Sequence, residues 1–426
     1  APDSVKAVIA AAGGPGIAAN WNAHQLERFG QDDVTLFVNT KTILSNPALS
    51  GMIVGMMAMS GQQVTPQQLQ QWEALAVSLR VEKDGVRLGV YVGLQDGSDV
   101  AKLWTSGDAK SGTFLTGLPG ERYILAVGME QDATRAAVSA DNMQQEFQKK
   151  MQMMGAGADT AKMTELVNTF AGMFRDLRDL SFSVSAAPAG GDGLVGFAKV
   201  TTFEKGAAEK CAQIPEILQA IGAVVPSPQV QEALKNVKYM PGAETIAGAK
   251  VDHLIIALDQ VPGVTPEDYS KVKKVVGSEG LVFRIAALDD QHVVATLGGG
   301  TARLGKVIEL VQGKSAPLST DEGIKKAAAM LPNDRYSEGY LAVDTLLNFV
   351  KEVGKAIGED PDIPFTVPQV NAPLGMVMAP VEKTGLQVDV AVPMALLSAA
   401  KDVAVSQSAP PAPVENNVPE ATPTPE

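Results

Sequence analysis

The sequence predicts an α+β protein of two similar halves, with a mostly antiparallel sheet covered by helices. Two repeated segments lead to this prediction. VEKDGVRLGVYV at 81–92 returns as VEKTGLQVDVAV at 381–392, and LPGERY at 118–123 returns as LPNDRY at 331–336. The longer segment alternates in side-chain character after a glycine turn, which is typical of a β-hairpin. The repetition therefore predicts a duplicated scaffold, which does not by itself indicate a reaction.

The chain divides into four units of the order strand, helix, β-hairpin, helix, with two units in each half. The repeated Leu-Pro-x-acidic-Arg-Tyr element joins the two units within each half. The predicted parts are a first half at 1–222 with units at about 34–105 and 120–222, a connection at 223–249, a second half at 250–405 with units at about 250–312 and 336–404, and a tail at 406–426.

In the first half, the expected helices and strands follow from apolar periodicity and turn residues. Unit one contains a strand at 34–38, a helical stretch through Trp72, a hairpin at 76–92 with its tip at Asp84-Gly85, and a helix at 98–104 with Ser98 as N-cap. Unit two contains a strand at 123–127, helices within 132–176 that break near 153–157, a hairpin at 180–203, and a closing helix at about 206–221.

The connection and the second half follow the same plan. A short helix is expected at 230–237 within the connection. Unit three contains a strand at 251–258, a helix that Thr265 caps and Pro266 begins, a hairpin at 281–297 and a helix at 302–311. Unit four contains a strand at 339–343, a helix at 344–357, a hairpin at 375–392 and a helix at 394–403.

Alternation along the first hairpin separates two sets of side chains. Val86, Leu88, Val90 and Val92 alternate with residues 87, 89 and 91, which are Arg, Gly and Tyr. An antiparallel sheet commonly packs one face on the core and leaves the other face wetter. We therefore expect amphipathic helices to cover the valine and leucine face.

Composition limits the classes of function. The 426 residues carry a net charge of −13, which disfavours binding to nucleic acid. No run approaches the roughly 18 apolar residues of a transmembrane helix, so no transmembrane segment is expected. The start Ala1-Pro2-Asp3 is typical of a mature terminus left after signal cleavage. We therefore expect an exported protein, periplasmic or extracellular, with a disordered or polyproline-like tail at 406–426.

No motif predicts catalysis, a cofactor or a metal site. Residues 300–307 match the phosphate-binding pattern GxxxxGK, but Val307 replaces the serine or threonine that would bind magnesium. The three histidines lack partners at ligand spacing. The single cysteine, Cys211, is expected to be a packed helical residue, and acidic pairs such as Asp32-Asp33 are expected in solvated turns.

Methionine-rich stripes are the candidate binding surface. Methionine is flexible and polarisable, which suits an apolar groove or a partner surface. The same stripes also fit a packed core, and the sequence leaves both interpretations open. The candidate residues are Met52, Met56, Met59, Met143, Phe147, Met151 and Met154.

The repeated units, with LPGERY at 118–123 and LPNDRY at 331–336, resemble a group of uncharacterised exported bacterial proteins that includes planctomycete ones. The resemblance covers about residues 30–404, implies export and brings no catalytic residues. The expected function is a non-enzymatic binding or scaffold protein of the bacterial envelope or extracellular space. The alternatives are a carrier of an apolar ligand or lipid, a subunit of a self-assembling extracellular structure, and an enzyme.

Overall fold

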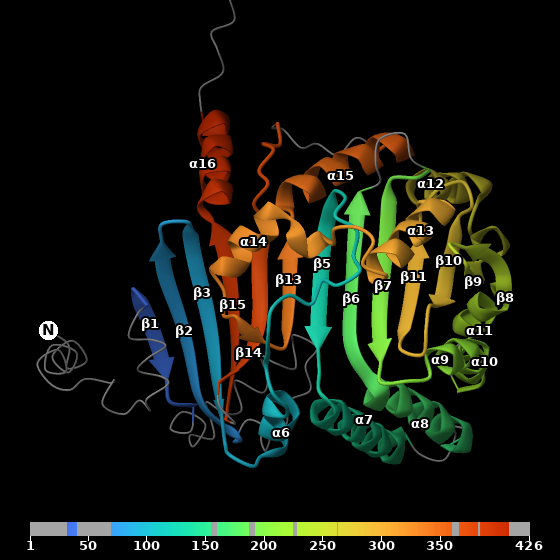
Figure 1. The fold of residues 1–426 in the computed structure, drawn as a ribbon, viewed down its shortest axis with the longest axis horizontal. Helices are drawn as coiled ribbons and strands as arrows, with labels where there is room; N and C mark the ends of the chain where they lie inside the picture. The colour runs from blue at the N-terminus through green and yellow to red at the C-terminus, as the bar shows by residue number, and fades with distance from the viewer. Residues whose placement is uncertain are drawn as a thin grey trace, which may run out of the picture.

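The computed structural model describes residues 32–40, 70–154, 160–186, 192–224, 228–261, 263–359, 366–381 and 384–408. Within these ranges the chain forms one 13-stranded sheet whose neighbouring strands are all antiparallel, together with helices that lie on the sheet and at its ends (Figure 1). The predicted α+β class with a large antiparallel sheet is confirmed. The arrangement in two repeated halves stays a prediction.

The sheet order mixes early and late parts of the chain. The order is β1-β2-β3-β15-β14-β13-β5-β6-β7-β11-β10-β9-β8, and β4 pairs separately with β12. The strands are β1 (Val34–Val38), β2 (Trp72–Glu82), β3 (Gly85–Leu94), β4 (Lys110–Ser111), β5 (Tyr123–Glu130), β6 (Leu177–Ala186), β7 (Val195–Phe203), β8 (Val237–Ile246), β9 (Ala249–Ile256), β10 (Leu281–Ala287), β11 (His292–Leu297), β12 (Asp334–Arg335), β13 (Ser337–Leu341), β14 (Leu374–Val381) and β15 (Gly385–Pro393).

Helices connect these strands. They are α6 (Asp99–Thr105), α7 (Ala133–Met154), α8 (Thr160–Asp176), α9 (Ala207–Ala212), α10 (Ile214–Val224), α11 (Pro228–Lys235), α12 (Pro266–Val276), α13 (Gly300–Val311), α14 (Glu322–Ala329), α15 (Val343–Ile357) and α16 (Met394–Ser408), with 3-10 turns at Leu258–Gln260 and Leu318–Thr320. Within the described ranges, no helix combines the length and apolar character needed to cross a bilayer.

The repeated segments lie side by side. β3 and β15 pair antiparallel with Gly89 opposite Asp389, which are equivalent positions of the repeat. The strands that follow the Leu-Pro repeats, β5 and β13, also pair antiparallel, with Val127 opposite Gly339. The first strands of the chain are therefore neighbours of its last strands, as the blue and red strands of Figure 1 show.

Both copies of the longer repeat form hairpins, as predicted. Gly85 and Gly385 each begin the second strand of their hairpin. The first turn lies at Lys83-Asp84, one residue earlier than expected, because Gly85 already pairs with Glu82. A Cβ atom on Gly85 would collide with the carbonyl oxygen of Val392 and lie 2.9 Å from the Cα of Pro393, so the close approach of β3 to β15 requires glycine here.

Two predicted helix ends are wrong. Trp72 begins β2 rather than ending a helix, and residues 41–69 lie outside the described ranges. The closing helix expected at 206–221 is divided into α9 and α10, and Pro215 occupies the first turn of α10, where its missing N–H breaks no helical bond.

The predicted connection contains a strand that the sequence analysis missed. β8 pairs with β9 and forms one edge of the sheet. Its pairing is irregular between Met240 and Glu244, where Pro241 and Gly242 lie. These two residues suggested a loop, but an edge strand tolerates proline because its outer N–H groups need no ladder partner. Helix α14, which Asp321 caps, was also not predicted.

Most helix starts follow their sequence signals. Ser98 caps α6 by accepting a hydrogen bond from the N–H of Ala101. Thr265 and Asp268 form a reciprocal capping box at the start of α12, with Pro266 at the first helical position. Helices α7 and α8 divide the predicted 132–176 region near the expected break. These local signals therefore act as expected.

One face of the sheet, which we call the covered face, carries the main core. Helix α13 places Leu304, Val307 and Ile308 on this face, all fully buried against residues such as Val200 and Val294. Helices α13 and α14 lie across the strands in Figure 1. Each such aliphatic side chain contributes about 1.5–3 kcal/mol through burial.

The covered face near β3 and β15 also buries charge. The Arg87 guanidinium lies 3.3 Å from an Asp32 oxygen and 3.9 Å from an Asp389 oxygen. Asp389 is fully buried and also accepts a hydrogen bond from Gln387. The expectation that Asp32 occupies a solvated turn is wrong, because its side chain is almost fully buried beside Arg87.

Asp389→Ala tests this buried pair. It removes one partner and leaves the Arg87 charge with less compensation, so we expect a loss of about 3–5 kcal/mol in unfolding free energy. Asp99→Ala is the control, because Asp99 pairs with Lys102 on the surface and should change stability by about 1 kcal/mol or less. Urea denaturation measures both variants. Equal stability of the two would contradict a structural role for the buried pair.

Candidate functional site

The first hairpin has the opposite orientation to the one expected from its alternation. Leu88 and Val90 are 40% and 39% exposed, whereas Tyr91 is 4% exposed and Arg87 faces the buried charge cluster. The expectation that helices cover the valine and leucine face is therefore wrong for this hairpin. The physical reason is that Tyr91 packs with Ala74 and Ala76, while Arg87 pairs with carboxylates. Both side chains can therefore be buried without an unpaired charge.

The outward set belongs to a larger apolar surface, which we call the open face. Direct cross-strand partners lie on the same face of a sheet. Leu36 pairs with Val77, Val77 with Val90, and Val90 with Val388. The large apolar side chains of the described residues that lie on this face and are 36–64% exposed are Val34, Leu36, Val77, Val81, Leu88, Val90, Met129 and Met376. Contiguous exposed apolar surface typically marks an interaction site.

One cross-strand row continues from the open face towards the other end of the sheet. Met376 pairs with Gly339, Gly339 with Val127, Val127 with Phe182, and Phe182 with Lys199. We call this the long row. Val127 and Phe182 are half-buried. The long row therefore joins exposed apolar side chains of β14 to a lysine of β7.

Lys199 lines a small pocket between the sheet and the helices α8, α9 and α10. The pocket has a volume of about 160 Å³. Its walls are mostly apolar and come from both the helices and the strands. They are Met173, Thr201, Phe203, Lys210, Cys211, Ile214, Ile285, Val293 and Ala295.

The two lysines of this pocket differ in charge compensation. Lys210 Nζ lies 2.5 Å from an Asp176 oxygen. For Lys199 there is no ion pair with any described residue, and burial alone lowers the pKa of its ammonium group. Lys199 is half-buried, and an ammonium that has lost part of its hydration without gaining a carboxylate is destabilised. An anion in this pocket would therefore compensate the charge of Lys199.

Cys211 is a packed thiol, in agreement with its expected role. It is 6% exposed on α9. Burial first, and the charge of Asp252 second, raise the pKa of its thiol to about 11. The thiolate is the nucleophilic form of cysteine, so this environment keeps Cys211 unreactive at neutral pH.

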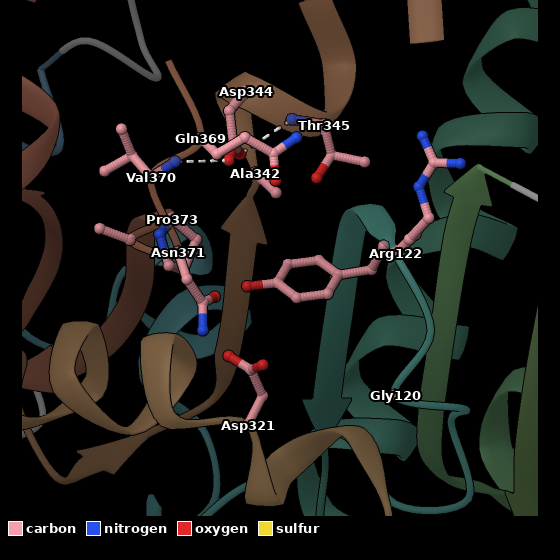
Figure 2. A pocket seen from close by; sticks show the side chains of 12 residues that line it. Gly120, Arg122, Asp321, Ala342, Asp344, Thr345, Gln369, Val370, Asn371 and Pro373 are labelled. Carbon is pink, nitrogen blue, oxygen red and sulfur yellow. Dashed lines mark hydrogen bonds between the residues drawn. The ribbon is translucent and has the colours of Figure 1, made fainter. Parts of the chain in front are cut away.

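A second pocket, polar and about 310 Å³ in volume, lies at the end of β5 and β13. Figure 2 shows Asp344 and Asp321 on opposite sides of it. Asp344 accepts hydrogen bonds from the N–H groups of Thr345 and Val370, both 2.8 Å long, and Asp321 accepts one from Ile324. Burial and these two carboxylates raise the pKa of the Tyr123 hydroxyl. Both acidic groups thus already stabilise local backbone.

The arginines of the repeated joint make structural contacts. Arg122 Nη2 lies 2.9 Å from a Glu352 oxygen at the rim of the polar pocket. Arg335 is buried, lies 3.1 Å from a Glu338 oxygen and donates to the carbonyl of Gly112. Each arginine therefore connects its joint to a separate part of the fold.

The predicted methionine surface is only partly described. Met52, Met56 and Met59 lie outside the described residues. Met143 and Phe147 are half-buried on α7. Met151 and Met154 also belong to α7, and their side chains lie outside what the structure describes. None of the described members lines either pocket discussed above.

The phosphate-loop pattern has a structural explanation. Gly300 begins α13, and the preceding glycines turn the chain from β11 into this helix. Val307 is fully buried in the core.

Two of the histidines pair with carboxylates. His253 lies 2.7 Å from Glu244, and His292 lies 2.8 Å from Asp289. Among the described residues, no group of three or more potential ligands could hold a metal ion.

The comparisons with known proteins add no family. No family model and no curated protein matches the chain. Two solved structures, crystal forms IV and III of TP0453, align at 8% identity and a TM-score of 0.28. They cover 69% and 71% of this chain, and the alignments span 97% and 99% of their own chains. A likeness at this level carries no argument about function.

Cys211 gives a direct test of the packing of α9 against the sheet. We expect no measurable alkylation of the native protein by iodoacetamide at pH 8, because burial raises the pKa of this thiol to about 11. Unfolding in urea should release full reactivity. Mass spectrometry of the modified peptide measures both states. Rapid stoichiometric labelling of the native protein would contradict the burial of this thiol.

Proposed function

We propose that this protein is a non-enzymatic binding protein that carries an apolar ligand, such as a lipid, on its open face. The observation that supports the proposal is the outward orientation of the first hairpin. Its side chains Leu88 and Val90 point away from the covered face. Its side chains Arg87 and Tyr91 are buried, and Arg87 is paired with Asp32 and Asp389. Covering the exposed apolar side chains with an apolar partner is favourable, because it removes their surface from water.

Self-association is the competing proposal. Two copies could cover their open faces against each other, because the exposed apolar side chains extend to the edge strand β1. The pocket around Lys199 favours the carrier, since it offers a mostly apolar hollow at the end of the long row. Native mass spectrometry separates the proposals by reporting bound small molecules and assembly size in one measurement.

Val90→Glu tests the open face. The substitution places a charge in the middle of the exposed set, so we expect at least a tenfold loss of affinity for Nile red, an uncharged dye that fluoresces in apolar surroundings. Stability should change by about 1 kcal/mol or less, because Val90 is a surface position. Dye titration and urea denaturation measure the two effects.

Val405→Glu is the matched control for this experiment. It makes the same chemical change at a valine of α16 that is 61% exposed and does not belong to the open face. We expect unchanged dye affinity. Equal loss in both variants, or no loss in either, would refute a binding role for the open face. A wild-type protein that is dimeric at micromolar concentration and becomes monomeric with Val90→Glu would favour self-association.

The proposed location is outside the cytoplasm, in the envelope or the extracellular space. Fractionation of cells that express the natural gene, followed by detection of this chain, tests the location. Recovery in the cytoplasmic fraction alone would overturn it. The carrier proposal itself does not depend on the compartment, because it is supported by the open face.

A further inference from the structure

We propose that the carried ligand is a long-chain carboxylate, held with its head group at Lys199 and its alkyl chain along the long row. This inference rests on the proposed function, because it assigns a ligand class to the same open face. It adds a charged anchor, which the exposed apolar side chains alone do not supply.

The first argument is charge complementarity. Lys199 lies in an apolar pocket and makes no ion pair with a described residue, whereas Lys210 in the same pocket is neutralised by Asp176. A carboxylate at Lys199 would form a charge-assisted hydrogen bond and compensate the ammonium. An alcohol or alkane of equal length could not provide this compensation.

The second argument is the size of the pocket. Its volume of about 160 Å³ corresponds to about five water molecules. A carboxylate and the first few methylene groups fit such a space, whereas a glycerophospholipid head group is much larger. The size therefore favours a compact anionic head over the head group of a membrane lipid.

The third argument is continuity with the open face. Phe182 is the direct cross-strand partner of Lys199, and Phe182 and Phe197 lie with ring centroids 6.3 Å apart. From Lys199 the long row passes Val127 and Gly339 to Met376. The row crosses four strand spacings of about 4.8 Å, roughly 19 Å in all, which is comparable with an extended palmitoyl chain.

Gly339 is the smallest member of this row and is itself buried. A Cβ atom at this position would meet no atom closer than 3.8 Å. The neighbouring strand residues, Met376 and Val127, are large and apolar. The glycine therefore adds no side chain of its own between them, and an alkyl chain would cross the centre of the sheet over Met376 and Val127.

The test compares two ligands that differ only in head group. Purified, delipidated full-length protein is titrated with palmitate and with hexadecanol, using displacement of Nile red as the readout. We expect the wild-type protein to bind palmitate at least about tenfold more tightly than hexadecanol, as one charge-assisted hydrogen bond predicts. This comparison needs no variant, so it does not depend on the folding of a mutant.

Lys199→Met assigns the preference to this residue. Methionine is one atom shorter than lysine and removes the charge, and the fold should tolerate it because the half-buried ammonium has no carboxylate partner among the described residues. We expect about a tenfold loss of palmitate affinity with hexadecanol affinity unchanged. Lys325→Met is the matched control, because Lys325 pairs with Glu322 on α14, which lies on the covered face and outside this pocket, so the variant should retain the preference.

Each other outcome overturns the inference in a distinct way. Equal affinity of the wild-type protein for palmitate and hexadecanol would refute the charged anchor at Lys199. It would not contradict the proposal that the protein carries an apolar ligand. A palmitate preference that survives Lys199→Met, or that is lost equally in Lys325→Met, would refute the assignment to Lys199. Tighter binding of hexadecyl phosphate than of palmitate would refute the carboxylate. Failure of the wild-type protein to bind palmitate, hexadecanol and Nile red would overturn the proposed function as well.

Discussion

Antiparallel pairing between distant strands is the constraint on which the rest of the structure depends. Buried backbone N–H and C=O groups must find partners, and β3 and β5 find theirs on β15 and β13, more than 200 residues later in the chain. These two pairings join the early and late parts of the chain into one sheet. Because register fixes which side chains share a face, they also place the open face and the long row on one continuous surface.

The two faces of this sheet satisfy their side chains in different ways. The covered face packs α13 and α14 over aliphatic residues, and near β3 and β15 it pairs Arg87 with Asp32 and Asp389. The open face leaves Leu88 and Val90 at about two-fifths exposure. Burying a paired charge cluster while apolar side chains stay exposed lowers the stability of an isolated monomer. That imbalance is the physical basis for assigning a partner to the open face.

The candidate site needs contributions from parts of the chain that share no sequence signal. Lys199 is one lysine in an alternating strand, and its neighbours in sequence do not distinguish it. Its environment arises from Met173 on α8, Cys211 on α9 and Ile214 on α10, together with Ala295 on β11, the sheet neighbour of β7. The methionine stripes, in contrast, were conspicuous in the sequence, yet Met143 and Phe147 are simply half-buried on α7.

The sequence by itself determined the local elements: the repeated hairpins at β2-β3 and β14-β15, the caps at Ser98 and Thr265, and the antiparallel α+β class. Turn residues, caps and apolar periodicity act over a few residues, so they can be recognised from the sequence alone. Only the tertiary structure decided which face of the first hairpin is buried and that β8 is an edge strand. Alternation separates two faces but does not say which is covered, because that depends on whether distant groups such as Asp389 satisfy Arg87.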